Sequence, residues 1–143
     1  SAPYFTQIAS FSSSLSTRPV TWELPMFGQT GVAARTDYQV LGPGECLLFL
    51  TANKADGSEG QVFCARTRDG GASFEFVSPI GPDLHGPGWA IMPASLRLPD
   101  RRLLAALRCG RPAGGDRPWH HWIDLYSSDD SGASWRHLAQ PVP

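Results

Sequence analysis

The hydrophobic residues of this chain fall into short runs separated by glycine, proline and polar residues. Residues 47–52 and 103–107 are apolar runs that follow Pro-Gly or Pro-Asp turns, and residues 61–67 and 122–127 alternate or are rich in β-formers. Such patterns are typical of short β-strands bounded by turns. No capped stretch of ten or more residues carries the 3.6-residue period of an amphipathic helix. The chain is therefore predicted to be all-β.

An internal repeat organises these strands. Residues 67–74 and 128–135 both read [Ser/Thr]-x-Asp-x-Gly-x-Ser-[Phe/Trp] at a separation of 61, and residues 40–48 align with 96–104 at an offset of 56. A weaker echo lies at residues 21–24. We expect two four-stranded antiparallel meanders, each a stacked supersecondary unit. Their strands are predicted at 36–41 and 91–98 (A), 46–52 and 102–108 (B), 61–67 and 121–127 (C), and 74–78 and 135–139 (D).

Four-stranded sheets that recur every 50 to 60 residues or so are the blades of a β-propeller. The predicted units are a partial blade, containing C and D strands, in residues 1–30, a blade in residues 31–80 and a blade in residues 81–143. An open wedge of blades would leave apolar faces and strand edges in water. The sequence therefore predicts part of a ring of about six blades, completed either by a longer chain or by homo-oligomerisation, for example as a trimer.

The Asp motif is predicted to shape the turn between strands C and D. The carboxylate of Asp69 or Asp130 can accept hydrogen bonds from the backbone N–H groups that follow it, and the motif glycine can adopt a left-handed backbone angle. The terminal aromatic residue is expected to turn back under the hairpin. The structural residues of the two motifs are Thr67, Asp69, Gly71, Phe74, Ser128, Asp130, Gly132 and Trp135.

These motifs are Asp boxes. Together with residues 92–98, 103–108 and 122–130, they give the chain a resemblance to the bacterial sialidase superfamily, the BNR or Asp-box β-propellers, over residues 31–140. The resemblance implies propeller blades and leaves two functions open. One is a sialidase-like glycoside hydrolase that acts on terminal anionic sugars; the other is a non-catalytic propeller module that binds glycan or protein. It also favours a bacterial secreted or periplasmic protein, although the sequence does not determine the compartment.

The resemblance implies a carboxylate-binding arginine set, an Asp acid/base and a Tyr nucleophile. Arg35 and Arg108 are the candidate ligands of an anionic group, since paired guanidinium groups suit a planar carboxylate. At the offset of 56, Arg35 aligns with Ile91, the place of the family's first arginine. Asp56 is the candidate acid/base, with an exposed Asp-Gly turn as the alternative. The nucleophile would come from a blade outside this chain, so the chain alone is expected to be inactive.

Aromatic and histidine residues complete the candidate site. His85 and Trp89 are predicted to face the substrate, and Trp119 is a further stacking candidate; the alternative for each is loop packing. Tyr126 is expected to pack between blades. His120 and His121 are adjacent and would point to opposite faces of a strand, so they cannot share a metal ion. No metal and no other cofactor is predicted.

Charge and composition argue against nucleic acid and membrane as partners and leave the carbohydrate or protein that the resemblance implies. Twelve Lys and Arg residues stand against thirteen Asp and Glu, and there is no basic cluster of the kind that binds nucleic acid. No apolar run approaches the roughly 20 residues of a membrane-spanning helix. Lys54 is the single lysine. The three cysteines lack metal-binding spacing and are expected to be reduced and half-buried; they are Cys46, Cys64 and Cys109.

Overall fold

The computed structural model describes residues 8–11, 20–82, 86–114 and 119–143, and their side chains apart from those of 8–11, 20–23, 34–36 and 59. In this part of the chain every regular element is a strand and no helix occurs, as predicted. The strands are β1 (Ile8–Phe11), β2 (Val20–Glu23), β3 (Val32–Gly42), β4 (Glu45–Asn53), β5 (Glu59–Thr67), β6 (Glu75–Ile80), β7 (Trp89–Arg97), β8 (Leu103–Pro112), β9 (Trp119–Ser128) and β10 (Arg136–Val142).

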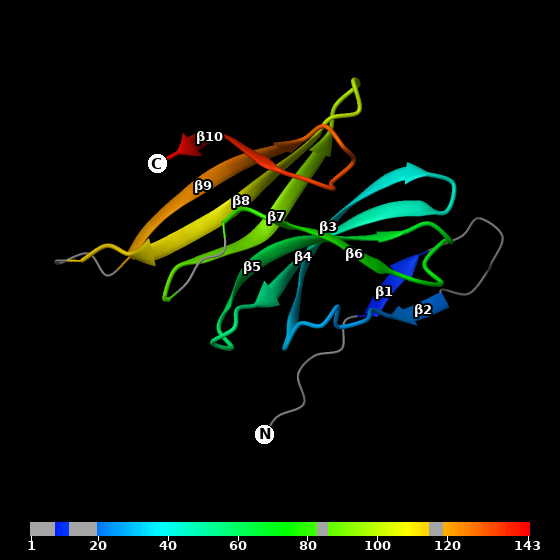
Figure 1. Ribbon diagram of the computed structural model, residues 1–143, viewed down its shortest axis with the longest axis horizontal. Coiled ribbons are helices and arrows are strands. Elements are labelled where there is room, and N and C mark those ends of the chain that lie inside the picture. The colour runs from blue at the N-terminus through cyan, green and yellow to red at the C-terminus, as the bar shows by residue number, and fades with distance from the viewer. Residues whose placement is uncertain (1–7, 12–19, 83–85, 115–118) are drawn as a thin grey trace.

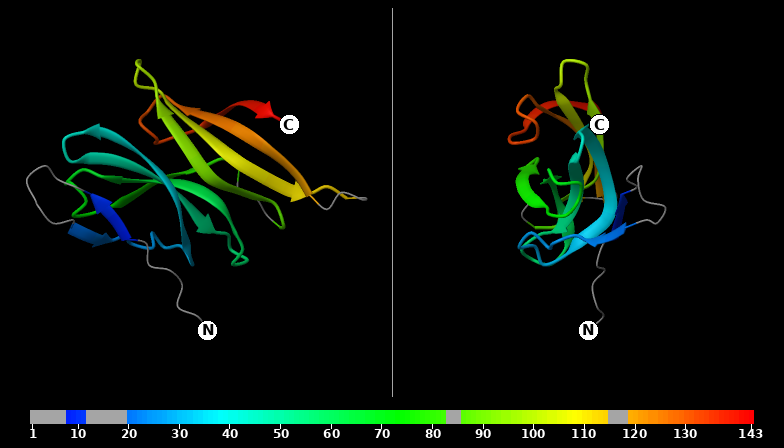
Figure 2. Two further views of the ribbon diagram at one scale, coloured as in Figure 1. Left: turned by 180° about the vertical axis from the view of Figure 1, so that it is seen from behind. Right: turned by 90° about the vertical axis from the view of Figure 1, so that its right-hand side faces the viewer.

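Eight of these strands form two antiparallel meanders of four strands each (Figure 1). The first sheet has the order β3-β4-β5-β6 and the second β7-β8-β9-β10, while β1 pairs only with β2. Each of the eight predicted strands of the two units overlaps an observed strand, with ends that differ by a few residues. Strand β7 lies across the first sheet, in contact with β3, β4 and β5 (Figure 2).

The pairing register shows which positions of the two sheets are equivalent. Cys46 pairs with Thr67 at the start of the first box, and Leu103 pairs with Ser128 at the start of the second. Because the boxes are equivalent, Cys46 and Leu103 are equivalent too, at a separation of 57. The predicted offset of 56 is therefore wrong by one residue. A shift of one residue exchanges the two faces of a strand, so the difference decides which faces correspond.

The two sheets pack through faces that are not equivalent to each other. Leu47 of the first sheet is fully buried in one cluster with Leu103 and Ala105 of the second. The counterparts of Leu103 and Ala105 in the first sheet are Cys46 and Leu48, which lie in a separate cluster on its opposite face. The contact is head to tail, as between successive units of a stack. Such an interface does not close after two units.

The outer faces of the two sheets differ in how they are covered. On the first sheet, Leu24 and Phe27 pack against the apolar cluster of the outer face. On the second sheet, Leu104 is only half-buried, although its counterpart Leu47 is fully buried. Leu96, which pairs with Leu104, is 56% exposed. The second sheet covers the inner face of the first sheet. No described residue covers the apolar outer face of the second sheet as fully.

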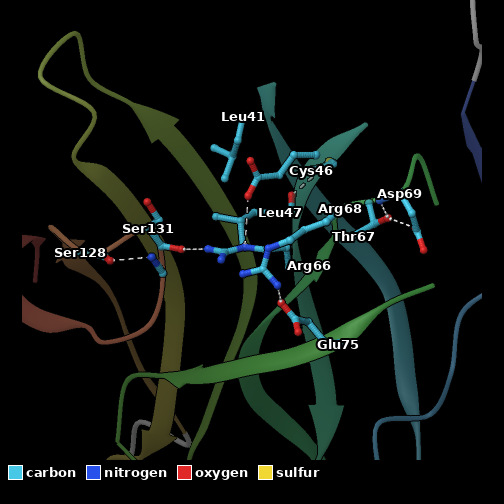
Figure 3. A network of polar contacts seen from close by, with 12 residues as sticks. Leu41, Cys46, Leu47, Arg66, Thr67, Arg68, Asp69, Glu75, Ser128 and Ser131 are labelled. Atoms are coloured by element: carbon cyan, nitrogen blue, oxygen red, sulfur yellow. Dashed lines mark hydrogen bonds and ion pairs between the residues drawn. The ribbon is translucent and has the colours of Figure 1, made fainter. Parts of the chain in front are cut away.

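Polar contacts reinforce the head-to-tail interface at the box end of the sheets (Figure 3). Arg66 on β5 donates a hydrogen bond to the carbonyl oxygen of Ser131 in the second box. The hydroxyl of Ser78 on β6 donates to the carbonyl oxygen of Gly132, at 2.6 Å. Arg66 also lies 3.8 Å from the carboxylate of Glu45. The second box is thus attached to the first sheet as well as to its own hairpin.

Each box performs the predicted turn chemistry. Asp69 Oδ1 accepts the backbone N–H of Ser73 at 2.9 Å, and Oδ2 accepts the Ser73 hydroxyl at 2.6 Å. The buried hydroxyl of Thr67 donates to Asp69 at 2.9 Å and accepts the N–H of Gly71 at 2.8 Å. The glycines have positive φ, 97° and 89°. The second box repeats the same contacts with Ser128, Asp130, Gly132 and Ser134.

The aromatic residues of the two boxes pack in different apolar clusters. Trp135 joins the cluster between the sheets and meets Phe49 edge-on, with ring centroids 6.0 Å apart. Phe74 packs against the outer cluster of the first sheet. Tyr126 is buried in the cluster between the sheets, as expected, and burial raises its pKa to about 12. The side chains of the Asp boxes and their neighbours therefore serve turn formation and packing at this end of the molecule.

The cysteines are more deeply buried than predicted. All three are free thiols, and Cys46, Cys64 and Cys109 are at most 6% exposed. Desolvation raises their pKa values to about 11, 12 and 12 respectively. The expectation of half-buried thiols was wrong because both faces of the first sheet and the inner face of the second are covered.

Replacing Thr67 by Val is expected to destabilise the fold by about 1–3 kcal/mol, because it leaves the buried N–H of Gly71 without its acceptor. Thr51→Val is the matched control, since Thr51 is also fully buried but its hydroxyl has no hydrogen-bond partner in the described part of the chain. Urea unfolding should show a loss for the first variant and no loss for the second. Equal losses would contradict the role assigned to the box hydroxyl.

The boxes also predict a loss of stability in acid. Hydrogen bonds from Ser73 and Ser134 lower the pKa values of Asp69 and Asp130 from 3.8 to about 2. Because the folded pKa is the lower one, the stabilisation is complete above about pH 4 and is lost as the pH falls through about 2. The double variant Asp69→Asn/Asp130→Asn should lose part of this acid dependence in urea titrations at pH 5 and pH 3. If the free energy of unfolding fell by the same amount between pH 5 and pH 3 in the double variant and in the parent, the assignment would be refuted.

Candidate functional site

The candidate site lies at the end of the sheets opposite the Asp boxes. Lys54, directly after β4, is 5% exposed and connects two loops there. Its ammonium group donates hydrogen bonds to the carbonyl oxygens of Gly86 and, at 2.7 Å, Gly88. These glycines come just before β7. The loop after β4 and the start of β7 are thereby held together by a buried cation.

Arg108 and Trp89 meet at this end. The Arg108 guanidinium carbon lies 5.3 Å from the centroid of the Trp89 ring, a cation–π contact. Arg108 is exposed, and its other described contact is a weak one with the sulfur of Met92, at 3.9 Å. No described carboxylate pairs with it. Within the described part of the chain, Arg108 thus lies beside an aromatic ring without a carboxylate partner.

Two glycines create the space that Trp89 occupies. A Cβ on Gly110 of β8 would lie 2.4 Å from the Trp89 ring, and one on Gly60 of β5 would lie 2.7 Å from the Trp89 Cβ. Gly60 has a φ of 152°, a backbone angle that side chains rarely allow. Because one glycine comes from each sheet, the position of Trp89 depends on how the sheets pack.

Trp119 and His121 extend the aromatic surface beside Trp89. The ring centroids of Trp89 and His121 are 5.5 Å apart, and Trp119 lies 6.4 Å from both. Trp119 is 41% exposed. Sequence analysis considered these side chains and Arg108 separately, or only as alternatives. In the structure they form one surface of a cation and three rings. We call it the Arg108 surface, and its residues are Trp89, Arg108, Trp119 and His121.

His120 lies on the other face of β9, as predicted from its adjacency to His121. It stacks on Trp122 with ring centroids 5.2 Å apart. Trp122 donates its indole N–H to Asp124 at 2.8 Å, and Asp124 also lies 3.2 Å from His137. No group of three or more His, Cys, Asp or Glu side chains suited to a metal ion occurs among the residues searched, which are the described ones.

Asp56 has the chemistry of a turn residue. Its Oδ1 accepts the backbone N–H of Ser58 at 2.9 Å and the Ser58 hydroxyl at 2.6 Å, and Lys54 lies 3.8 Å away. The hydrogen bonds from Ser58, helped by Lys54, lower the pKa of Asp56. A general acid needs a raised pKa at neutral pH. The geometry therefore favours the predicted alternative, an exposed Asp-Gly turn.

The remaining candidates are placed only in part. His85 lies outside the described residues. Arg35 lies in β3, but its side chain is outside the described set. Ile91 pairs with Arg108 and Ala33 pairs with Thr51, the counterpart of Arg108. The counterpart of Ile91 is therefore Ala33, and the alignment of Arg35 with Ile91 was wrong. In β3 and in β7, a bulge separates this position from the next paired residues.

Sequence reasoning missed three residues that shape this end. Lys54 had a signal, because it is the single lysine of the chain. Gly60 and Gly110 had none that separates them from the other glycines, since their role comes from contact with Trp89 across the fold.

Comparison with known proteins adds no relative to this picture. No protein-family model matches the chain, and no curated protein matches it either. No helix among the described residues is long and apolar enough to cross a membrane.

Gly110→Ala is expected to displace Trp89, because the added methyl group would lie 2.4 Å from the ring. Overpacking of this kind costs about 1–3 kcal/mol. Near-ultraviolet circular dichroism should change in the tryptophan region, and urea unfolding should show the loss. Gly42→Ala is the control, since nothing lies within 4 Å of its Cβ position. A Gly110→Ala spectrum identical to that of the parent would contradict the described seat of Trp89.

Proposed function

We propose that this chain is a blade pair of an Asp-box β-propeller of the sialidase type, and that its Arg108 surface binds an anionic sugar. The observation that carries the binding function is Arg108 itself, an exposed guanidinium that lies over Trp89 and has no described carboxylate partner. A guanidinium offers paired N–H donors to a carboxylate, and tryptophan faces stack on sugar rings.

The head-to-tail packing supports the propeller. Successive blades in a ring bury different faces against each other, as the two sheets do here, and each blade exposes the same face to the next one. The half-buried Leu104 and the exposed Leu96 stand where the first sheet buries its inner face. A following blade would cover them, supplied either by a longer chain or by further copies of this one.

Hydrolysis would need groups that the described residues do not bring together. Asp56 is hydrogen-bonded in an exposed turn with a lowered pKa, which does not suit a general acid. Tyr126 is buried between the sheets with a raised pKa and cannot reach a ligand at the Arg108 surface as a nucleophile. These observations favour sugar recognition by this chain, with any sialidase-type cleavage requiring the rest of a ring.

Calorimetric titration tests the binding. The chain should bind 3′-sialyllactose and not lactose, because only the first carries a carboxylate. Arg108→Gln should weaken binding about tenfold or more, since hydrogen bonds to charged groups contribute about 1.5–3 kcal/mol. Arg102→Gln is the matched control; Arg102 pairs with Asp100 in the turn at the box end.

A fluorogenic α-sialoside tests cleavage by the same preparation, which is expected to release no product. Binding of lactose as tight as that of 3′-sialyllactose would overturn the proposed function. So would equal effects of the Arg108→Gln and Arg102→Gln substitutions.

A further inference from the structure

Met92 has a backbone conformation that methionine rarely adopts. Its φ angle is 52°, in the left-handed region that favours glycine. Ser131 also has a positive φ, 59°, but it lies in the turn of the second box, where its counterpart in the first box is Gly70. Met92 lies within strand β7, where such an angle is unfavourable and persists only when the surroundings hold it. A strained residue beside a candidate site points to a use for the strain.

The unusual angle belongs to a bulge in β7. The register of β7 with β8 shifts between Ile91 and Ala94. Met92 and Pro93 are the two residues in this gap, and they lie opposite a single residue of β8. Proline fits such a place because it has no N–H to donate to the neighbouring strand. A bulge also turns side chains of its strand away from strict alternation.

The bulge brings Met92 to the face of the sheet on which Arg108 lies. Ile91 is the cross-strand partner of Arg108, so these two side chains leave the same face. Under strict alternation the next residue, Met92, would leave the opposite face. Instead, the sulfur of Met92 lies 3.9 Å from a nitrogen of the Arg108 guanidinium. The bulge and its positive φ therefore direct Met92 toward Arg108.

The guanidinium of Arg108 is contacted from two positions on β7. The ring of Trp89 has its centroid 5.3 Å from the guanidinium carbon, and the sulfur of Met92 accepts a weak hydrogen bond. A thioether sulfur carries no charge, so it leaves the positive charge of Arg108 available to an anion, as a carboxylate in its place would not. An arginine that is already held loses less side-chain freedom when it binds.

We infer that Met92 is a positioning residue for Arg108. Its strained backbone is kept because it places a neutral acceptor against the guanidinium and holds that group over Trp89, ready for an anion. This rests on the proposed function, and it adds a residue that acts through Arg108 without touching the ligand. Stability and binding then make opposite demands on this position, because glycine would relieve the backbone strain but would remove the contact.

Calorimetric titration of the full chain with 3′-sialyllactose tests the contact. Met92→Leu keeps the apolar bulk without the sulfur, and it should weaken binding about threefold, as expected when one flexible side chain must be ordered on binding. Met92→Gln has an amide oxygen as acceptor and should keep the parental affinity. Met26→Leu is the matched control and should also keep it, because Met26 is the other methionine of the chain and lies beside residues 72–74 of the first box.

Urea unfolding tests the strain. Met92→Gly should have a higher urea midpoint than Met92→Ala, because both variants remove the side chain and only glycine relieves the positive φ. In an ordinary strand the order is the reverse. Both variants should weaken binding as Met92→Leu does. At the control position, Ser131→Gly should likewise unfold at a higher midpoint than Ser131→Ala, and neither should change the affinity for 3′-sialyllactose.

The outcomes separate this inference from the proposed function. If Arg108→Gln weakens binding and Met92→Leu does not, the inference is overturned and the proposed function stands. Equal losses with Met92→Leu and Met92→Gln also overturn it, because shape rather than the acceptor would then decide binding. A Met92→Gly midpoint at or below that of Met92→Ala overturns it too, since the position would then carry no strain. A parent chain that does not bind 3′-sialyllactose overturns both.

Discussion

The structure depends on the way each Asp box satisfies the backbone of its own turn. The hydroxyl and the carboxylate of the box take up the N–H groups of the turn, as Thr67 and Asp69 do. Some carbonyl oxygens of the turn can then accept hydrogen bonds from elsewhere. In the second box, those of Ser131 and Gly132 accept from the first sheet. A local turn motif therefore also fixes how one sheet lies on its neighbour.

Head-to-tail packing gives the two sheets different chemistry on equivalent faces. On the inner face of the first sheet, Asp37 and Gln39 hydrogen-bond to Ser95 of the second. Their counterparts on the outer face of the second sheet, from the strand pairing, are Ala94 and Leu96. A following sheet at that face would thus meet apolar side chains where the existing interface has polar ones. The two junctions would be held by different forces, even though the backbone geometry repeats.

The sequence predicts the strands and the box turns well because both depend on neighbouring residues: alternation, turn residues and one carboxylate. It does not predict the exact correspondence between the units. Aligning residues 40–48 with 96–104 by similarity gives an offset that differs by one from the pairing. Similarity matches Leu47 with Leu103, whereas the pairing makes Leu47 equivalent to Leu104. A one-residue error exchanges faces. Together with the unequal bulges in β3 and β7, it aligned Arg35 with Ile91, whose counterpart is Ala33. The contact of Lys54 with Gly86 and Gly88 joins separate loops, and no local pattern encodes it.

The two ends of the molecule use charge in opposite ways, and the second depends on the first. At the box end, carboxylates are occupied by N–H and O–H donors, so their charge is used within the turn. At the other end, Arg108 lies over an aromatic ring with no described carboxylate to neutralise it. The ring of Trp89 keeps its place through glycines of both sheets, Gly60 and Gly110. Since the second box helps to fix how the sheets lie on each other, it also helps to fix the position of Trp89, and the proposed anion-binding surface far from the turns depends in part on the hydrogen bonds of that box.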